Sequence, residues 1–444
     1  MKRLRARDSN RNEARSENES EKSEELTESS VVKSDYCIVA PIDYCGTVGR
    51  SIRHFFLALI EVGQPILVLL QRKRTPFMTR CMKGASFLGT EDFLGLWLVF
   101  LQLCVNTKLA RMYIILMAIS MFAVGYFKAV LRLPRPRLPL VKPLELAQDW
   151  ALPSNHATIA SCLPMYVWIY SYIDSAALGL SSIQVVGIFI VMCSWSFSVM
   201  FSRIYIGIHS PADVVTGGIL GCFLLSVFLQ IDKQLDSLIS QESAPWIFFL
   251  LVIFLCRLYP SVESTDPGLS DGISVLGVAF GQVLARSLRT GPILPAVLEE
   301  TAALSAQTIL LNCVIRMLLA GILAGSCEFL LKPMFYSAFS SFYDVFGLDF
   351  YSGSKERKQA FKDPQQRYAK HLTHSFRIPP INLEGSKDES QSEILSRLAD
   401  PHFTPSSKWN IDLPVKFTIY SILMYSIVEI LPVGLGFIPK HLLQ

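Results

Sequence analysis

The sequence predicts an all-α fold, a polytopic bundle of membrane helices, and its composition, its apolar runs and its charge each point to it. Of the 444 residues, 51% are hydrophobic and only 18% are charged, and the mean hydropathy is +0.38. A soluble domain offers too little interior for this apolar surface, whereas a bilayer accepts helices of about 20 apolar residues. The 41 basic and 37 acidic residues are spread along the chain, which argues against nucleic acid as a partner.

Ten apolar runs are candidate membrane helices, and we expect nine or ten of them to span the bilayer. They cover residues 54–71, 87–105, 111–128, 157–178, 184–203, 213–231, 245–260, 272–288, 305–331 and 416–439. The first run is the weakest, because His54, Glu61 and Pro65 interrupt it, and it could instead lie flat at the membrane interface. Glu91 and Asp92 weaken the second run.

The chain divides into five parts by composition. Residues 1–50 form a polar tail that is expected to be disordered, and residues 51–232 form a six-helix core. Three or four additional C-terminal membrane helices lie in residues 233–331 and 416–444, on either side of a polar extramembrane insertion at 332–415. None of the ten cysteines shows zinc-ligand spacing, so we expect no metal site and no disulfide framework.

The candidate catalytic and binding residues lie in three short clusters at the ends of the apolar runs. The clusters are Lys128 to Pro136, Pro153 to His156, and Ser202 to Asp213. If the helices alternate in direction, the third helix ends, the fourth begins, the fifth ends and the sixth begins on one face of the membrane. The three clusters can therefore meet there, which favours a shared site over three unrelated helix ends.

The residue types in these clusters suit phosphoryl transfer without a metal ion or other cofactor. Lys128, Arg135 and Arg203 are cations that match the charge and the oxygen geometry of a phosphate monoester. The hydroxyl of Ser154 and the backbone N–H groups around Asn155 add donors at the positive end of a helix. Taken alone, the basic stretch around Lys128 could equally contact anionic lipid headgroups.

Two histidines divide the remaining work in this hypothesis. Asp213 follows His209 by four residues, close enough to orient the ring and leave its other nitrogen free as a nucleophile. His156 would be the general acid that protonates the leaving alkoxide and later activates water. A single histidine near a helix end is more often a capping or hydrogen-bonded residue, so the hypothesis depends on the three clusters acting together.

These residues resemble the type 2 phosphatidic acid phosphatase superfamily of membrane phosphatases. Its pattern is a Lys, six residues and Arg-Pro; then Pro-Ser-x-His; then Ser-Arg, five residues, His, three residues and Asp. The chain meets every fixed position with Lys128, Arg135, Pro136, Pro153, Ser154, His156, Ser202, Arg203, His209 and Asp213. Asn155 stands where many members carry Gly. The resemblance covers about residues 54–232 and implies a phosphohistidine on His209.

Within that superfamily the chain looks most like the sphingosine 1-phosphate and long-chain base 1-phosphate phosphatases. This resemblance implies an amphipathic lipid phosphate as substrate and a multi-pass protein of the endoplasmic reticulum membrane. The site is luminal if the run at 54–71 spans the bilayer and the N-terminus is cytosolic, and it faces the other side if that run lies flat. Asp149 and Trp150 are candidates for meeting the amino group of a sphingoid base, or they only anchor their loop at the interface. The alternatives are a phosphatase for phosphatidate, lysophosphatidate or an isoprenoid diphosphate, and a non-catalytic transporter or scaffold.

Overall fold

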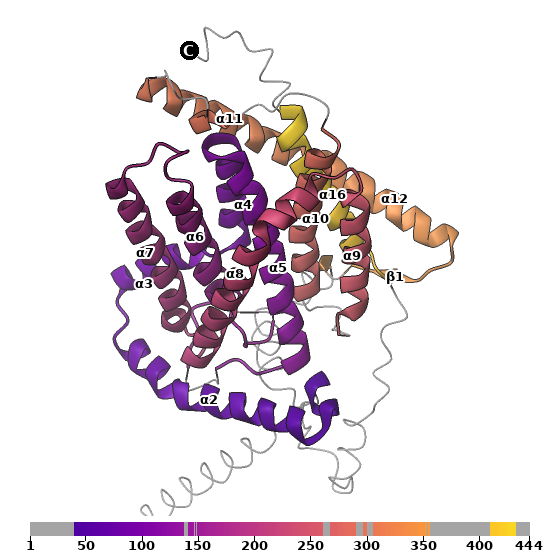
Figure 1. Ribbon diagram of the computed structural model, residues 1–444. Coiled ribbons are helices and arrows are strands. Elements are labelled where there is room, and N and C mark those ends of the chain that lie inside the picture. The colour runs from indigo at the N-terminus through magenta and orange to yellow at the C-terminus, as the bar shows by residue number, and fades with distance from the viewer. Residues whose placement is uncertain are drawn as a thin grey trace, which may run out of the picture.

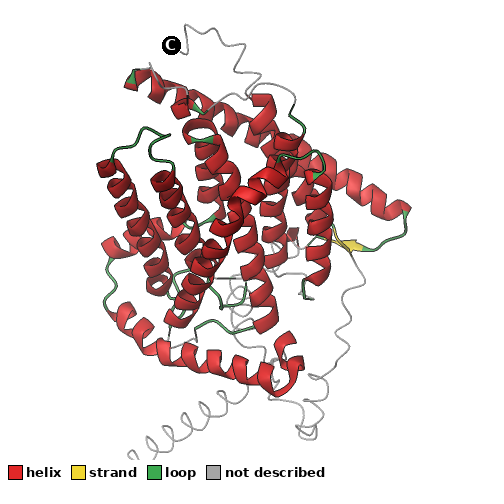
Figure 2. Ribbon diagram, viewed as in Figure 1, coloured by secondary structure: helices red, strands yellow, loops and turns green. Residues whose placement is uncertain are grey.

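The computed structural model describes residues 40–136, 141–145, 147, 149–260, 267–289, 296–299, 305–352, 354–355 and 409–431. Helices account for nearly all of the regular structure in these ranges, as Figure 2 shows. The described strands are β1 (Phe350–Tyr351) and β2 (Trp409–Asn410), which pair in parallel. The predicted fold class, an all-α membrane helix bundle, is confirmed.

Four helices form the centre of the bundle and carry the three sequence clusters at their ends. They are α5 (Thr107–Leu131), α6 (Asn155–Ile173), α7 (Ser182–Ile206) and α8 (Pro211–Ile239). α6 packs against the other three, and Figure 1 shows the four running side by side. Side-chain caps begin three of them: Asn106 caps α5, Ser181 caps α7 and Ser210 caps α8. These three helices therefore start where the sequence supplies a capping oxygen.

The segment before α5 is a bent pair of helices that together are long and apolar enough for one membrane span. α3 (Pro76–Phe87) and α4 (Glu91–Phe100) meet at a bend of 58°, and a π-helical turn, Leu101–Val105, continues α4. Thr75 and Thr90 cap the two helices through their hydroxyls. The sequence predicts only the second helix of this pair. Arg80 and Lys83 make the first too polar for an apolar-run criterion.

α2 (Gly46–Arg72) takes a different direction from the rest of the bundle. It follows a short 3-10 helix, η2 (Pro41–Cys45), and is long and apolar enough to cross a membrane. Figure 1 nevertheless shows it lying across the ends of α5, α7 and α8. Its outward face is a stripe of exposed apolar side chains: Val48, Ile52, Phe55, Leu59, Val62, Ile66 and Leu69. This arrangement favours the interfacial alternative for the first apolar run. It also makes the last residues of the predicted 1–50 tail helical.

The C-terminal helices extend the bundle on the far side of α5. They are α9 (Ala244–Leu258), α10 (Gly268–Ser287), α11 (Ala306–Ser326), α12 (Lys332–Val345) and α16 (Asp412–Tyr425), with π-helical turns at Cys327–Leu331 and Ser426–Ile430 and a 3-10 turn, η4, at Val297–Glu299. α10 packs between α5 and α16. α10 and α16 approach so closely that a Cβ on Gly281 would lie 2.3 Å from the backbone oxygen of Ser421. Helix α12 begins inside the predicted 332–415 insertion, and most of that insertion, 356–408, lies outside the described residues.

The described part of the chain has seven helices that are long and apolar enough to span a membrane, or eight with the bent pair counted as one span. The protein is a multi-pass membrane protein. The sequence prediction of nine or ten spans exceeds this count, because α6 and α9 do not meet the same test. α9 is short, at 15 residues. α6 is surrounded by other helices, so much of its surface needs no lipid-compatible side chains.

Candidate active site

The three sequence clusters meet at one end of the central helices. The backbone N–H of Ser154 donates to the carbonyl oxygen of Asp213 at 3.2 Å, which joins the second cluster to the third. Arg135 Nη1 donates to the carbonyl oxygen of Ile208 at 2.8 Å, which joins the first to the third. The convergence expected from alternating helix directions is therefore present.

A half-buried carboxylate lies between two of the predicted phosphate-binding cations. Asp149 accepts a hydrogen bond from Lys128 Nζ through one oxygen and from Arg135 Nη2 through the other. Burial raises the pKa of Asp149, but the charges of Lys128 and Arg135 outweigh it and hold that pKa well below its ordinary value. Lys128 and Arg135 are only 4% and 5% exposed, so this internal anion compensates two charges that water cannot reach freely.

The imidazole of His209 contacts the same arginine. Arg135 Nη1 lies 2.9 Å from His209 Nε2. A guanidinium can only donate, so Nε2 must accept with its lone pair and the ring proton belongs on Nδ1. Burial lowers the pKa of His209 well below its ordinary value, and repulsion from Arg135 and Lys128 adds to the effect. The ring is therefore neutral, with an available lone pair on the nitrogen that faces the cations.

Asp213 lies behind the other ring nitrogen. Its Oδ2 is 3.5 Å from His209 Nδ1. The same oxygen accepts from the backbone N–H of Ser210 at 2.7 Å, and the Ser210 hydroxyl accepts from the N–H of Asp213 at 3.2 Å, which closes a capping box at the start of α8. This box fixes the carboxylate beside the imidazole. Asp213 is fully buried, and its Oδ1 has no hydrogen-bond partner within the described residues.

The start of α6 presents unused polar atoms to the same space. Ser154 occupies the cap position, yet its side chain makes no capping hydrogen bond. It is fully buried, and its hydroxyl, like Oδ1 of Asn155, has no partner among the residues that the structure describes. Buried polar groups are nearly always hydrogen-bonded, so such orphaned atoms indicate a place where a polar ligand belongs.

Arg203 and His156 complete the group of predicted residues. Arg203 Nη1 donates to the hydroxyl of Ser86 on α3 at 2.6 Å and lies 3.9 Å from Oε2 of Glu145. A Cβ built on Gly89 would lie 2.7 Å from His156 Cδ2, so the turn between α3 and α4 packs directly on that imidazole. His156 lies within electrostatic range of Arg203, Lys128 and Asp149. We call Lys128, Arg135, Arg203, Ser154, His156, His209 and Asp213 the cationic cluster.

α2 covers this end of the bundle. A Cβ built on Gly63 would lie 2.8 Å from Cδ of Pro211, the first residue of α8. Arg53 Nε donates to the carbonyl oxygen of Leu131 at 3.3 Å, at the end of α5. After α2, Arg74 Nη2 donates to the carbonyl oxygens of Tyr205 and Ile206 at 2.7 and 3.0 Å, where α7 ends. Arg74 thus satisfies the last carbonyls of a helix.

All eight predicted site residues lie in or beside the cationic cluster, but three contributions were not predicted. For Asp149 the sequence predicts either an amine contact or a loop anchor, whereas its carboxylate accepts hydrogen bonds from Lys128 and Arg135. Ser86 and the packing of Gly89 on His156 come from α3 and its following turn, outside the three motifs. No group of three or more His, Cys, Asp or Glu among the described residues has the arrangement of a metal site.

Comparison with known proteins agrees with the location of this cluster. Residues 109–236 match the family model of the PAP2 superfamily. The matched segment runs from α5 to α8, and the predicted resemblance to this superfamily is confirmed. It begins later than the expected 54–232, because α2, α3 and α4 lie outside it.

The curated relatives share a phosphatase name. A "Probable sphingosine-1-phosphate phosphatase" of Dictyostelium discoideum is 30% identical over 264 residues, which are 58% of this chain and 65% of that protein. "Lipid phosphate phosphatase delta" of Arabidopsis thaliana is 27% identical, over 54% and 61%. "Sphingosine-1-phosphate phosphatase 2" of Homo sapiens is 29% identical, over 44% and 49%. The chain thus spans less than two thirds of the length of these relatives.

Among solved structures, a PAP2-type phosphatidylglycerolphosphate phosphatase from Bacillus subtilis aligns with a TM-score of 0.35 and 21% identity. The alignment covers 41% of this chain and 95% of that one.

Proposed function

We propose that this protein is a metal-independent membrane phosphatase that hydrolyses the phosphate monoester of sphingoid-base 1-phosphates through a phosphohistidine on His209. The observation that carries the proposal is the contact between Arg135 Nη1 and His209 Nε2, 2.9 Å apart. It puts a neutral nucleophilic nitrogen beside a guanidinium that can bind the transferring phosphoryl group. Simple phosphate binding would need the cations alone.

Binding begins with an exchange of anions. The substrate phosphate replaces the Asp149 carboxylate as the acceptor for Lys128 and Arg135, and Arg135 turns its donors from the imidazole to phosphate oxygens. Arg203 and the unbonded hydroxyl of Ser154 supply further donors. The start of α6, at Asn155, adds backbone N–H groups and the positive end of the helix dipole.

The chemistry then follows in two displacements. His209 Nε2 attacks phosphorus, a P–N bond forms, and the P–O bond to the lipid breaks. The leaving alkoxide takes a proton from His156, and Asp213 stabilises the positive charge on the phosphorylated ring. His156 then accepts a proton from water, which attacks phosphorus, breaks the P–N bond and releases inorganic phosphate.

The names of the relatives support a sphingoid-base phosphate as the substrate. Glycerol-based lipid phosphates are the alternative, and a name such as lipid phosphate phosphatase leaves it open. Parallel rates on sphingosine 1-phosphate, lysophosphatidate, phosphatidate and an isoprenoid diphosphate decide between them. Equal or faster hydrolysis of the glycerol-based lipids would overturn the sphingoid assignment.

The mechanism is tested with labelled substrate and His209→Ala. Wild-type protein quenched in base during turnover should carry acid-labile phosphate on His209, and the variant should carry none and lose nearly all activity. Activity should persist in EDTA. A variant that still hydrolyses the lipid, or wild-type activity that EDTA removes and magnesium restores, would contradict the mechanism.

The proposal includes the endoplasmic reticulum membrane and a luminal active site. Arg74, just after α2, contacts Tyr205 and Ile206, so the chain enters α3 on the face that carries the cationic cluster. If α2 does not cross the bilayer, the N-terminal tail lies on this face too. The sequon Asn18-Glu19-Ser20 and an engineered sequon in the 138–148 loop should then both be glycosylated. Modification of only one of them would show that α2 spans the membrane.

A further inference from the structure

A cavity lies beside the cationic cluster, between α5 and the helices α4, α10, α11 and α16. Its volume is about 420 Å³, and residues from α4, α5, α10, α11 and α16 line it. Only α5 among these elements belongs to the PAP2 match. The space suits a lipid chain better than a small solute, because its walls are mostly aliphatic.

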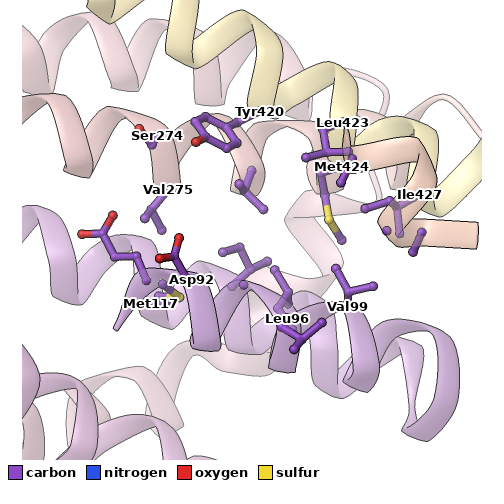
Figure 3. A pocket seen from close by; sticks show the side chains of 18 of the residues that line it. Asp92, Leu96, Val99, Met117, Ser274, Val275, Tyr420, Leu423, Met424 and Ile427 are labelled. Carbon is purple, nitrogen blue, oxygen red and sulfur yellow. The ribbon is translucent and has the colours of Figure 1, made fainter. Parts of the chain in front are cut away.

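The cavity has a charged end and an apolar end. Figure 3 shows Asp92, Ser274 and Tyr420 on one side and Leu423, Met424 and Ile427 on the other. The lining also includes Glu91, Asp271 and Lys416. Lys416 Nζ lies 3.4 Å from Asp271 Oδ1, so one of the three carboxylates has a cation. Glu91 and Asp92 form no ion pair with any described residue. We call this space the acidic cavity.

The charged end of the acidic cavity adjoins the cationic cluster. Glu91 lies two residues after Gly89, whose backbone packs on His156, and Glu91 is within electrostatic range of Asp149. On the other wall, a Cβ built on Gly125 of α5 would lie 3.5 Å from the backbone oxygen of Gly268, three residues before Asp271. Lys128 is three residues after Gly125, on the same helix. A single amphipathic molecule can therefore reach both places.

We propose that the acidic cavity binds the ammonium group and alkyl chain of the substrate, with Glu91 and Asp92 facing the ammonium. This inference rests on the proposed function, since the phosphate of the same molecule occupies the cationic cluster. In a sphingoid-base 1-phosphate the amine-bearing carbon is next to the carbon that carries the ester, so anion and cation are separated by a few bonds. Neighbouring sites of opposite charge match that separation, and a glycerol-based monoester has no cation to offer Glu91.

Charge complementarity favours this occupant over the other candidates. The carboxylates do not form a group that could hold a metal ion among the described residues. A neutral lipid chain would fill the apolar end but would bring no cation to Glu91 and Asp92, neither of which forms an ion pair with a described residue. An ammonium supplies the missing charge, and a single alkyl chain fits the remaining length.

The first test measures selectivity with purified full-length protein. Glu91→Gln should lower the ratio of kcat/KM for sphingosine 1-phosphate over lysophosphatidate at least tenfold, because only the first substrate loses an ion pair. Asp344→Asn, which removes an exposed carboxylate on α12, is the matched control and should keep the ratio. An unchanged ratio in Glu91→Gln would overturn the proposal.

The second test needs no catalysis, so it also applies if the proposed function fails. A photoactivatable long-chain amine without phosphate, and the matched long-chain alcohol, are compared on the His209→Ala protein. The amine should label α4, α10 or α16 several-fold more than the alcohol, and adding Glu91→Gln should remove this advantage. Equal labelling by amine and alcohol would mean that the cavity holds any alkyl chain and would defeat the inference.

Filling the cavity tests the position of the alkyl chain. Gly321 lines the acidic cavity, whereas Gly325 on the same helix does not, and a Cβ at either position would meet open space. Gly321→Phe should therefore raise KM for a long-chain substrate roughly tenfold relative to Gly325→Phe. Both variants introduce the same side chain into α11, so equal KM values would place the chain elsewhere.

Discussion

The cationic cluster and the acidic cavity lie next to each other, yet the chain builds them in opposite ways. In the cluster, Lys128 and Arg135 are already satisfied by an internal anion, Asp149. In the cavity, Glu91 and Asp92 form no ion pair with a described residue, although Lys416 lies within electrostatic range of Glu91, and most of the walls are apolar. A self-compensated site can exchange one anion for another at low cost, whereas an uncompensated one gains most from a ligand that brings the charge. In the proposed function the first region carries the chemistry, and in the further inference the second region carries the selectivity.

The largest effect is expected at His156, the proposed general acid of the cationic cluster. His156→Gln should lower kcat on the lipid about 10²-fold to 10⁴-fold, because the alkoxide would leave unprotonated. p-Nitrophenyl phosphate has a leaving group that needs no proton, so the variant should still form the phosphohistidine from it. Radiolabel retained on the protein measures this step. Parallel loss on both substrates would make His156 a structural residue.

The next largest effect is expected at Asp149, which compensates the charges of Lys128 and Arg135 in the cationic cluster. Asp149→Asn removes the competitor for Lys128 and Arg135, so vanadate should bind about tenfold more tightly as an inhibitor. Lipid turnover should fall, since the two cations lose the group that positions them. Inhibition curves with vanadate check this against Glu242→Gln, which changes an exposed carboxylate. Weaker vanadate binding in Asp149→Asn would mean that Asp149 serves only to hold the cations in place.

The pH profile addresses the imidazole on which the cluster depends. Burial, and then Arg135 and Lys128, lower the pKa of His209 from its ordinary 6.5. The nucleophilic neutral ring exists above that pKa, so kcat/KM should fall only as the pH drops below 6.5, after correction for ionisation of the substrate. A fall in kcat/KM that is already half complete at pH 6.5 or above would show that the cations do not act on His209 in the free protein.

The smallest effect is expected on stability, from a substitution in α2, the helix that covers the cationic cluster. Gly63→Ala places a Cβ 2.8 Å from Pro211 and should lower stability by about 1–3 kcal/mol, with a modest fall in activity as α2 moves. Gly84→Ala, where a Cβ meets open space, is the matched control. Thermal unfolding in detergent compares the two. Equal unfolding temperatures would indicate that α2 is not tightly packed on α8.

The two regions also differ in how far the sequence predicts them. The cationic cluster comes from local motifs at the ends of strongly apolar helices, so both its residues and their common face follow from the printed sequence. The acidic cavity joins Glu91, Asp271 and Lys416, which are far apart in the chain and belong to no motif. Nothing in the spacing indicates that α10 brings its carboxylate to α4. The position of Asp271 depends instead on tertiary packing, because Gly277 and Gly281 let α10 lie close against α16, which carries Lys416.

Helix direction is the other feature that the sequence leaves open. The apolar periodicity of α2 predicts one lipid-facing side, but it is the same for a helix that crosses the bilayer and for one that lies along it. The path is set by tertiary contacts, namely Gly63 on Pro211 and Arg53 on the end of α5. α3 was missed for a related reason, since its polar residues serve contacts such as Ser86 with Arg203.

The apolar stripe of α2 has a consequence for where the reaction occurs. If α2 rests among the lipid headgroups, its contact with the first residue of α8 sets the depth of His209 below the water boundary. Every substrate then presents its ester at the same height, whatever the length of its hydrocarbon tail. Variation in tail length must be absorbed farther into the leaflet, away from the bond that breaks.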